Sequence, residues 1–232
     1  MCYNAQSSIL SYLLGISGSV GLYNIKLVPE SLFFGWISQL QLVDYILWKN
    51  QPCNITESKK ICKPEEIKLC NKTNKQTTTA GMVLNNLEPV ILFMSIIIFS
   101  KKKLPIWVIS LVFLFMIVMM IYTIDTIKKK DTIEKECTYV TEESNPHLFW
   151  QWNYNRPYNG FIYTFFVILF VILAYYGFSN TYFSSIMMLL SYIVSAILYK
   201  DKKSIGTMWC FISAFFPWIL YGYNKFLIKG LI

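Results

Sequence analysis

The sequence predicts an all-α fold, a polytopic bundle of transmembrane helices. Its 232 residues are 55% hydrophobic and 17% aromatic, with a mean hydropathy of +0.43, which is more apolar than soluble domains usually are. Apolar windows of about 17–25 residues, long enough to cross roughly 30 Å of hydrocarbon, recur along the whole chain. These observations predict a single transmembrane domain over residues 1–232 with the lipid bilayer as its main partner.

Hydropathy predicts about seven spans, and an odd number places the two termini on opposite sides of the membrane. The first span has no basic residue before it, because the first lysine is Lys26, so we expect a retained helix rather than a signal peptide. Pro217 should kink the last span. The expected spans are residues 7–25, 31–48, 79–100, 104–124, 159–178, 181–199 and 205–224.

The net charge of +8 comes almost entirely from lysines, with Arg156 as the one arginine. A soluble protein with this charge would suggest a nucleic-acid partner. Here the lysines fall between apolar windows and no arginine-rich surface accompanies them. We interpret them as topology signals and contacts with anionic head groups, and expect no nucleic-acid partner.

Two connections are long, residues 49–78 and 125–158, and seven spans would place them on the same side of the membrane. Their cysteines lack the CxxC pairs of a zinc ribbon, so we expect disulfides and no metal site, with three pairings left open. The connections also contain two N-glycosylation sequons. The disulfide candidates are Cys53, Cys62, Cys70 and Cys137, and the glycosylation candidates are Asn54 and Asn71.

Two signals about the side of these connections conflict. Sequons and an even number of cysteines indicate an oxidising compartment, whereas the positive-inside rule would place lysine-rich loops in the cytosol. The chain uses lysine heavily throughout, which weakens the second signal. We therefore favour a lumenal or extracellular position for the N-terminus and the long connections.

The stretch NNLEPVILF places Glu88 and Pro89 inside an expected span. An ionised carboxylate at mid-bilayer costs about 2.5–3.5 kcal/mol, so Glu88 should face the bundle interior. Pro89 has no amide hydrogen, which frees the backbone oxygen of Asn85. Residues on the same helical face as Glu88 should also be internal. These are Gly81, Asn85, Leu92 and Ser95.

The second expected span contains a polar stripe that includes Gln41 and Asp44. If the two polar stripes face each other, they form a funnel from the long-loop side, with Asp44 near its entrance, Glu88 deeper, and Gln41 close in depth to Glu88. The alternative is that these groups only join helices by hydrogen bonds, worth about 0.6 kcal/mol each in membranes.

The single histidine, His147, opens a segment rich in aromatic residues that leads to Arg156. Such residues favour the membrane interface, so an interfacial belt is one interpretation. The other is a lid that holds His147 and Arg156 near Asp44.

Several short motifs together resemble a group of small uncharacterised seven-span proteins of large DNA viruses and some microbes. The resemblance implies the fold and a class of host, and no established activity. Its motifs are Met1-Cys2 before a serine-rich helix, the Gln41/Asp44/Trp48 span, Asn85 to Pro89, His147 to Trp152, and Gly206 to Cys210.

The residues that known seven-span families use for their chemistry are missing from this sequence. Retinal binding needs a lysine within the last span, whereas Lys225 and Lys229 lie beyond it. Zinc-dependent intramembrane hydrolases need several histidines, and GxSxG, Walker, CxxC and HExxH motifs are absent from the sequence. A catalytic pair formed by the Asp44 and Glu88 carboxyls would need both at the same depth in the membrane. Their positions along the expected spans place them at different depths. We expect no cofactor.

The sequence favours a non-enzymatic membrane protein, monomeric or homo-oligomeric, that binds or moves a small solute, cation or proton through a cavity around Glu88. Two alternatives remain open. One is an intramembrane lipid-modifying enzyme with Glu88 as acid or base and His147 assisting. The other is a receptor-like or scaffolding viral membrane protein that acts through its disulfide-bearing loops.

Overall fold

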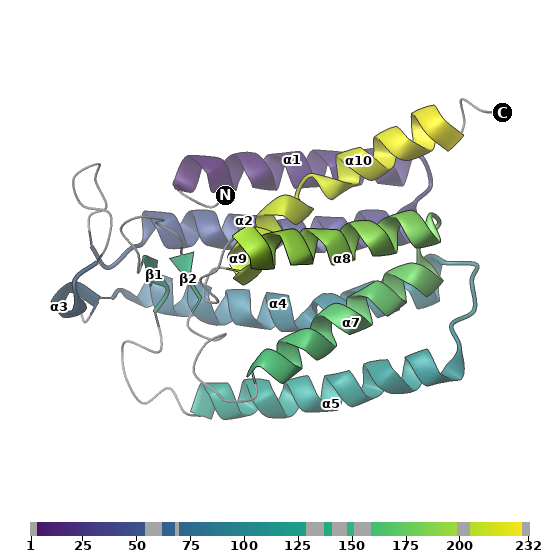
Figure 1. Ribbon diagram of the computed structural model, residues 1–232. Helices are drawn as coiled ribbons and strands as arrows, with labels where there is room; N and C mark the ends of the chain where they lie inside the picture. Colours follow the sequence, from purple (N-terminus) through teal and green to yellow (C-terminus); the bar gives the residue numbers. More distant parts are fainter. Residues whose placement is uncertain are drawn as a thin grey trace.

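The computed structural model describes residues 4–53, 62–67, 70–128, 137–140, 148–150, 159–198 and 205–228. Long helices lie side by side, and successive ones run in alternating directions between the two ends of the bundle (Figure 1). The expected all-α class is confirmed, with one short antiparallel ribbon added. The elements are α1 (Ala5–Asn24), α2 (Val28–Lys49), α3 (Pro64–Ile67), α4 (Lys72–Phe99), α5 (Ile106–Lys128), β1 (Tyr139–Val140), β2 (Leu148–Phe149), α7 (Asn159–Gly177), α8 (Thr181–Leu198), α9 (Ile205–Ser213), α10 (Phe216–Gly222) and a π-helical turn (Tyr223–Ile228).

Helical structure coincides with each segment expected to span the membrane. Three of the described helices are long and apolar enough to cross a bilayer, namely Lys72–Phe99, Ile106–Asp125 and Thr181–Leu198, and Phe161–Gly177 is apolar but shorter. These helices indicate a multi-pass membrane protein. Among the described residues, length and composition support three of the seven expected spans, and the count of seven stays a prediction.

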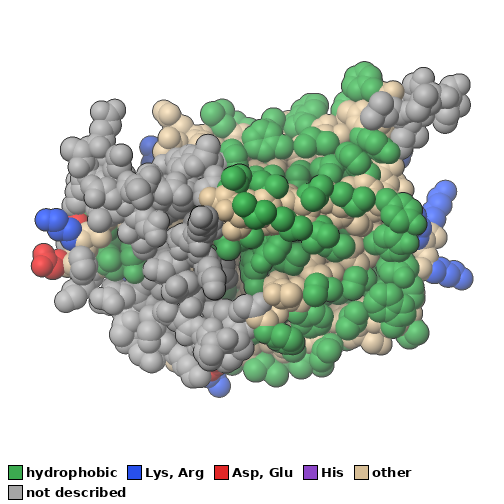
Figure 2. All heavy atoms as spheres, viewed as in Figure 1, with side chains coloured by type: hydrophobic (Ala, Val, Ile, Leu, Met, Phe, Trp, Pro, Cys, Tyr) green, Lys and Arg blue, Asp and Glu red, His purple; other side chains and the backbone are tan. Residues whose placement is uncertain are grey.

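Many large apolar side chains of the described helices lie on the outer surface of the bundle. Figure 2 shows hydrophobic side chains covering the flank, with lysines at the ends of the bundle. Large side chains on several helices are more than half exposed, which in a soluble protein would leave a large unfavourable patch and here fits contact with lipid. Examples are Leu10, Ile117, Ile121, Ile186 and Ile197.

Helix boundaries follow local sequence signals. Asn4 caps α1 by accepting a hydrogen bond from the Ser7 backbone N–H, and Asn71 caps α4 in the same way through Asn74. Pro29 lies in the first turn of α2, where its missing N–H costs nothing. Pro217 has a larger effect than the predicted kink, because the helix is interrupted between Ser213 and Phe216.

Small residues allow α1 and α2 to approach closely. A Cβ added at Gly15 would lie 2.1 Å from the Ser38 Oγ, so a larger residue there would force the helices apart. The Ser31 hydroxyl donates to the Ser19 backbone oxygen across the same interface, at 2.8 Å. This contact agrees with the general use of small residues where membrane helices meet.

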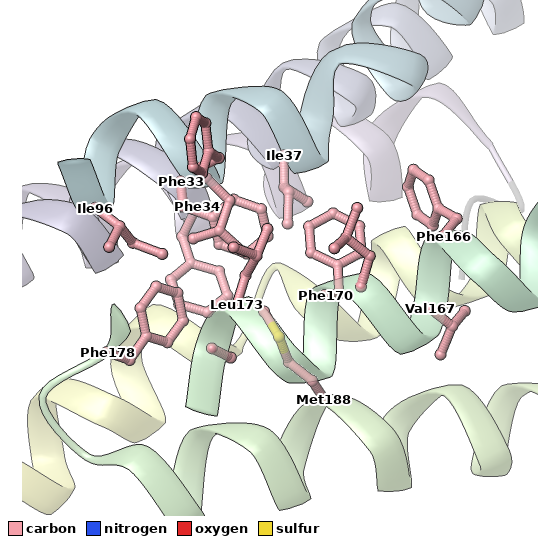
Figure 3. Close-up of a cluster of buried hydrophobic side chains, with 14 of the residues drawn as sticks. Phe33, Phe34, Ile37, Ile96, Phe166, Val167, Phe170, Leu173, Phe178 and Met188 are labelled. Carbon is pink, nitrogen blue, oxygen red and sulfur yellow. The ribbon is translucent and has the colours of Figure 1, made fainter. Parts of the chain in front are cut away.

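The centre of the bundle is an aromatic and aliphatic core built mainly from α2, α4, α5 and α7, to which α1, α8, α9 and α10 each add one or two buried side chains. Figure 3 shows side chains of α2 and α7 pointing toward one another, with Met188 of α8 beside them. The rings of Phe33 and Phe170 lie 5.2 Å apart between centroids, and those of Phe166 and Phe170 lie 4.6 Å apart. Aromatic contacts at such distances add to the energy of burial.

The end of the bundle that carries α3 and the ribbon is fixed by two disulfides, Cys53–Cys62 and Cys70–Cys137. The expected oxidation of the four loop cysteines is confirmed, and the structure selects one of the three pairings. Of the described cysteines, Cys210 is the one outside these disulfides, and it is buried.

Candidate functional site

Glu88 lies near the middle of α4, and its side chain is 3% exposed. The whole predicted polar face of α4 is buried, including Gly81, Asn85, Leu92 and Ser95. Glu88 borders a small internal cavity, here called the Glu88 pocket. Its lining comes from α2, α4, α7, α8 and α9: Phe33, Ile37, Glu88, Phe170, Met188, Trp209, Cys210 and Ser213.

The Glu88 pocket offers few partners to a carboxyl group. In the described part of the chain no hydrogen bond reaches its buried Oε1. The Ser213 hydroxyl in the lining donates to the Trp209 backbone oxygen instead, and the Trp209 indole donates to the Ser191 hydroxyl. Glu88 therefore stands among apolar and already bonded groups, an arrangement that proteins rarely retain for packing alone.

The volume of the Glu88 pocket is about 10 Å³, close to the minimum that holds one water molecule. A sugar, an amino acid or a lipid head group would not fit in this conformation.

The described structure covers Asp44 rather than leaving an open funnel. Asp44 and Gln41 are fully buried in α2, and the Asp44 Oδ1 accepts a hydrogen bond of 3.0 Å from the indole of Trp150. Trp150 is 1% exposed and packs with Leu148 in a cluster of apolar side chains between the helices. The segment predicted to be an interfacial belt or a lid thus places one aromatic residue directly on Asp44.

A buried polar network, here called the Thr138 clasp, holds the neighbouring connection. The Thr138 backbone N–H donates to the Asn74 Oδ1 at 2.9 Å and to the Thr78 Oγ1 at 3.1 Å. The Asn74 amide donates in return to the backbone oxygens of Thr138 and Asn50, both at 2.9 Å. Cys137, which precedes Thr138, is tied to Cys70 by the disulfide.

The region of Pro89 keeps its helical form, because α4 continues through Pro89 to Phe99. The backbone oxygen of Leu84, the residue before Asn85, accepts a hydrogen bond of 3.0 Å from the Trp36 indole. The free acceptor at Asn85 stays a prediction. Asn86 points away from the pocket and donates to the Thr123 hydroxyl of α5 at 2.8 Å.

Glu30, which the sequence did not single out, is a third buried carboxyl beside Glu88 and Asp44. It is 1% exposed, and its Oε1 accepts the Ser179 backbone N–H at 2.6 Å while its Oε2 has no hydrogen-bond partner in the described structure. Burial raises the pKa of Glu30, and the Ser179 N–H and the Lys102 charge only partly offset this. Hydropathy does not distinguish a buried acid at the end of a span from a solvated one. The partner of Glu30, Ser179, is also 149 residues away, so no local pattern in the sequence indicates this contact.

Several predicted residues lie outside the described residues, namely His147, Arg156 and Asn54. Asn71 is exposed at the start of α4, and its glycosylation stays a prediction. Within the described residues no group of acidic, cysteine or histidine side chains is placed to hold a metal ion.

No family model, no curated protein and no solved structure matches the chain. The resemblance to seven-span proteins of large DNA viruses therefore stays a prediction.

Proposed function

We propose that the chain crosses the membrane seven times and that the Glu88 carboxyl binds and releases a proton inside the bundle. The N-terminus and the long connections are assigned to the lumenal or extracellular side, where disulfides persist. The observation that carries the proposal is a carboxyl that is 3% exposed with a buried oxygen that no described group contacts by a hydrogen bond.

A carboxylate buried without a partner is costly, so Glu88 is stable only when something neutralises it. A hard cation would need several oxygen ligands, whereas Glu88 and Ser213 are the residues of the lining with side-chain oxygens. The volume of about 10 Å³ also leaves little room for a hydrated ion. A proton is the ligand that fits this pocket best among the solutes, cations and protons expected from the sequence.

The inward face of α2 supplies a route between the Glu88 pocket and the long-loop side. Ile37 lines the pocket, and Gln41 and Asp44 follow it at spacings of four and three residues, which places them on the same helical face. Because Trp150 covers Asp44, protons reach this route when Trp150 moves or when water enters beside it. The described structure is then the closed state.

The test is proton uptake by protein reconstituted in liposomes that contain a pH-sensitive dye. An imposed pH gradient should dissipate faster with the wild-type protein than with empty liposomes, and Glu88→Gln should return the rate to that of empty liposomes. Glu65→Gln is the matched control, because Glu65 is an exposed carboxyl on α3. Equal rates for the wild type and Glu88→Gln would refute the proposal.

The receptor-like or scaffolding function has one observation in its favour, because two disulfides and the Thr138 clasp fix one end of the bundle. A rigid, cross-linked end is suited to presenting a binding surface. If Glu88→Gln keeps full activity in cells while replacement of residues 54–61 abolishes it, this second function displaces proton binding.

A further inference from the structure

A groove of about 440 Å³ runs between α4 and α5 on the outside of the bundle, separate from the Glu88 pocket. It is lined by the α4 residues Leu87 and Val90, among others, and by one face of α5 from Phe113 to Ile124. Both helices are among those long and apolar enough to cross a membrane. The groove therefore opens toward the acyl chains of the lipids, and its volume is typical of a ligand site.

The length of the groove matches one leaflet. Thr123 and Phe113 are ten positions apart on α5, which corresponds to about 15 Å at a rise of about 1.5 Å per residue. This is half of the hydrocarbon thickness of about 30 Å. At the inner end the Phe113 ring meets Phe93 of α4, with centroids 6.4 Å apart. A chain that enters from the long-loop side thus ends near the bilayer centre.

Polar groups lie at the outer end of the groove. The Asn86 amide donates one hydrogen bond to the Thr123 hydroxyl at 2.8 Å, and an amide has a second N–H and a carbonyl oxygen to offer. Thr123 lies next to the end of the expected span 104–124, the depth at which ester groups of phospholipids meet the hydrocarbon. One or two polar groups in an apolar site are what orients a bound ligand.

A positive charge follows on the same face of α5. Lys128 comes four residues after Ile124, so the two side chains share a helical face. Lys128 is exposed in the last turn of α5. It is therefore in position to meet a phosphate whose acyl chain lies along the groove.

We propose that the α4–α5 groove binds one acyl chain of an anionic phospholipid from the long-loop leaflet. The chain lies between Thr123 and Phe113, an ester oxygen accepts a hydrogen bond from Asn86 or Thr123, and Lys128 contacts the phosphate. The proposal does not depend on Glu88 or on the number of spans beyond α4 and α5.

The test uses purified full-length protein in phosphatidylcholine nanodiscs that contain a small fraction of phosphatidylglycerol with a photoreactive diazirine in one chain. After illumination, mass spectrometry locates the labelled peptides. We expect labels concentrated on residues 83–90 and 113–124. Met120→Trp should fill the groove and remove most of this labelling, because Met120 lines it and is 59% exposed. Ile121→Trp is the control, because Ile121 is 60% exposed and does not line the groove.

Lys128→Gln should lower labelling by phosphatidylglycerol about fivefold and leave labelling by a diazirine phosphatidylcholine unchanged, since one lysine near a membrane surface contributes about 1 kcal/mol of attraction to anionic lipid. Leu87→Trp gives a second groove-filling variant if Met120→Trp misfolds. Labels spread evenly over the exposed faces of α5 and α8, or unchanged by both groove-filling variants, would overturn the proposal. In a parallel experiment with Met120→Cys, a disulfide between two copies under mild oxidation, together with loss of lipid labelling, would show that a second chain occupies the groove instead and would overturn the proposal.

Discussion

The Thr138 clasp and the Glu88 pocket both include residues of α4. They differ in whether their buried polar groups have hydrogen-bond partners. In the clasp, Asn74 and Thr78 exchange several hydrogen bonds with Thr138. In the pocket, the buried Oε1 of Glu88 has no hydrogen-bond partner within the described structure. Both regions are almost fully buried, so solvent does not account for the difference.

The difference separates polar residues that hold the fold from a residue kept for another purpose. Satisfied buried groups make a structure specific, whereas an unsatisfied one costs free energy that the rest of the fold must offset. Removing clasp residues should therefore destabilise the protein, and removing the Glu88 carboxyl should not.

The largest effect is expected from the disulfide that leads into the clasp. Cys70 and Cys137 are 67 residues apart, whereas Cys53 and Cys62 are 9 apart. In the chain-entropy account the long closure contributes about 4 kcal/mol and the short one about 2.5 kcal/mol. In a denaturant titration in detergent, the double variant Cys70→Ser, Cys137→Ser should lose more free energy of unfolding than the double variant Cys53→Ser, Cys62→Ser. Equal losses would show that the clasp forms without its cross-link.

Asn74→Ala should destabilise the protein by about 3 kcal/mol, because several buried donors and acceptors lose their partner at once. Thermal unfolding followed by circular dichroism measures the loss. Gln76→Ala, an exposed change one half-turn away, should alter stability by less than about 0.5 kcal/mol. A loss below about 1 kcal/mol for Asn74→Ala would mean that water replaces the clasp.

Glu88→Leu should leave stability unchanged or increase it by about 1 kcal/mol, since a buried unpaired polar group is replaced by an apolar one. The same variant should lose proton uptake. Asn86→Leu, which breaks the Thr123 hydrogen bond, is a matched control and should cost about 1 kcal/mol. Strong destabilisation by Glu88→Leu would show that Glu88 has a structural partner and would remove the contrast.

The smallest effect concerns pH and Glu30. Burial raises the pKa of Glu30 above its ordinary value of 4.5, so the folded protein holds this proton more tightly than the unfolded chain does. The resulting stability is fully present below pH 4.5 and is lost as the pH rises through the folded pKa. Glu30→Gln should flatten this decline in thermal stability above pH 4.5, and an unchanged pH profile would contradict the assignment.

Several features of the fold follow from the sequence. The helical segments, the buried face of α4 around Glu88, the oxidised loop cysteines and the disruption at Pro217 all follow from hydropathy, periodicity and residue chemistry. Helix periodicity places a polar group on an inward face, but it does not reveal what that group meets. The predicted funnel does not include the cover that Trp150 places on Asp44. That contact joins positions 106 residues apart, so the local pattern of the second span could not reveal it.

An apolar helical protein with an acid inside one helix can be predicted from the chain, because local periodicity and the cost of charge in hydrocarbon act along a single segment. The partners of the buried acids, the pairing of the cysteines and the groove between α4 and α5 are visible only in the folded protein. Those outcomes depend on how helices rotate and pack against one another, and contacts between distant segments leave no signal in the local pattern of one chain.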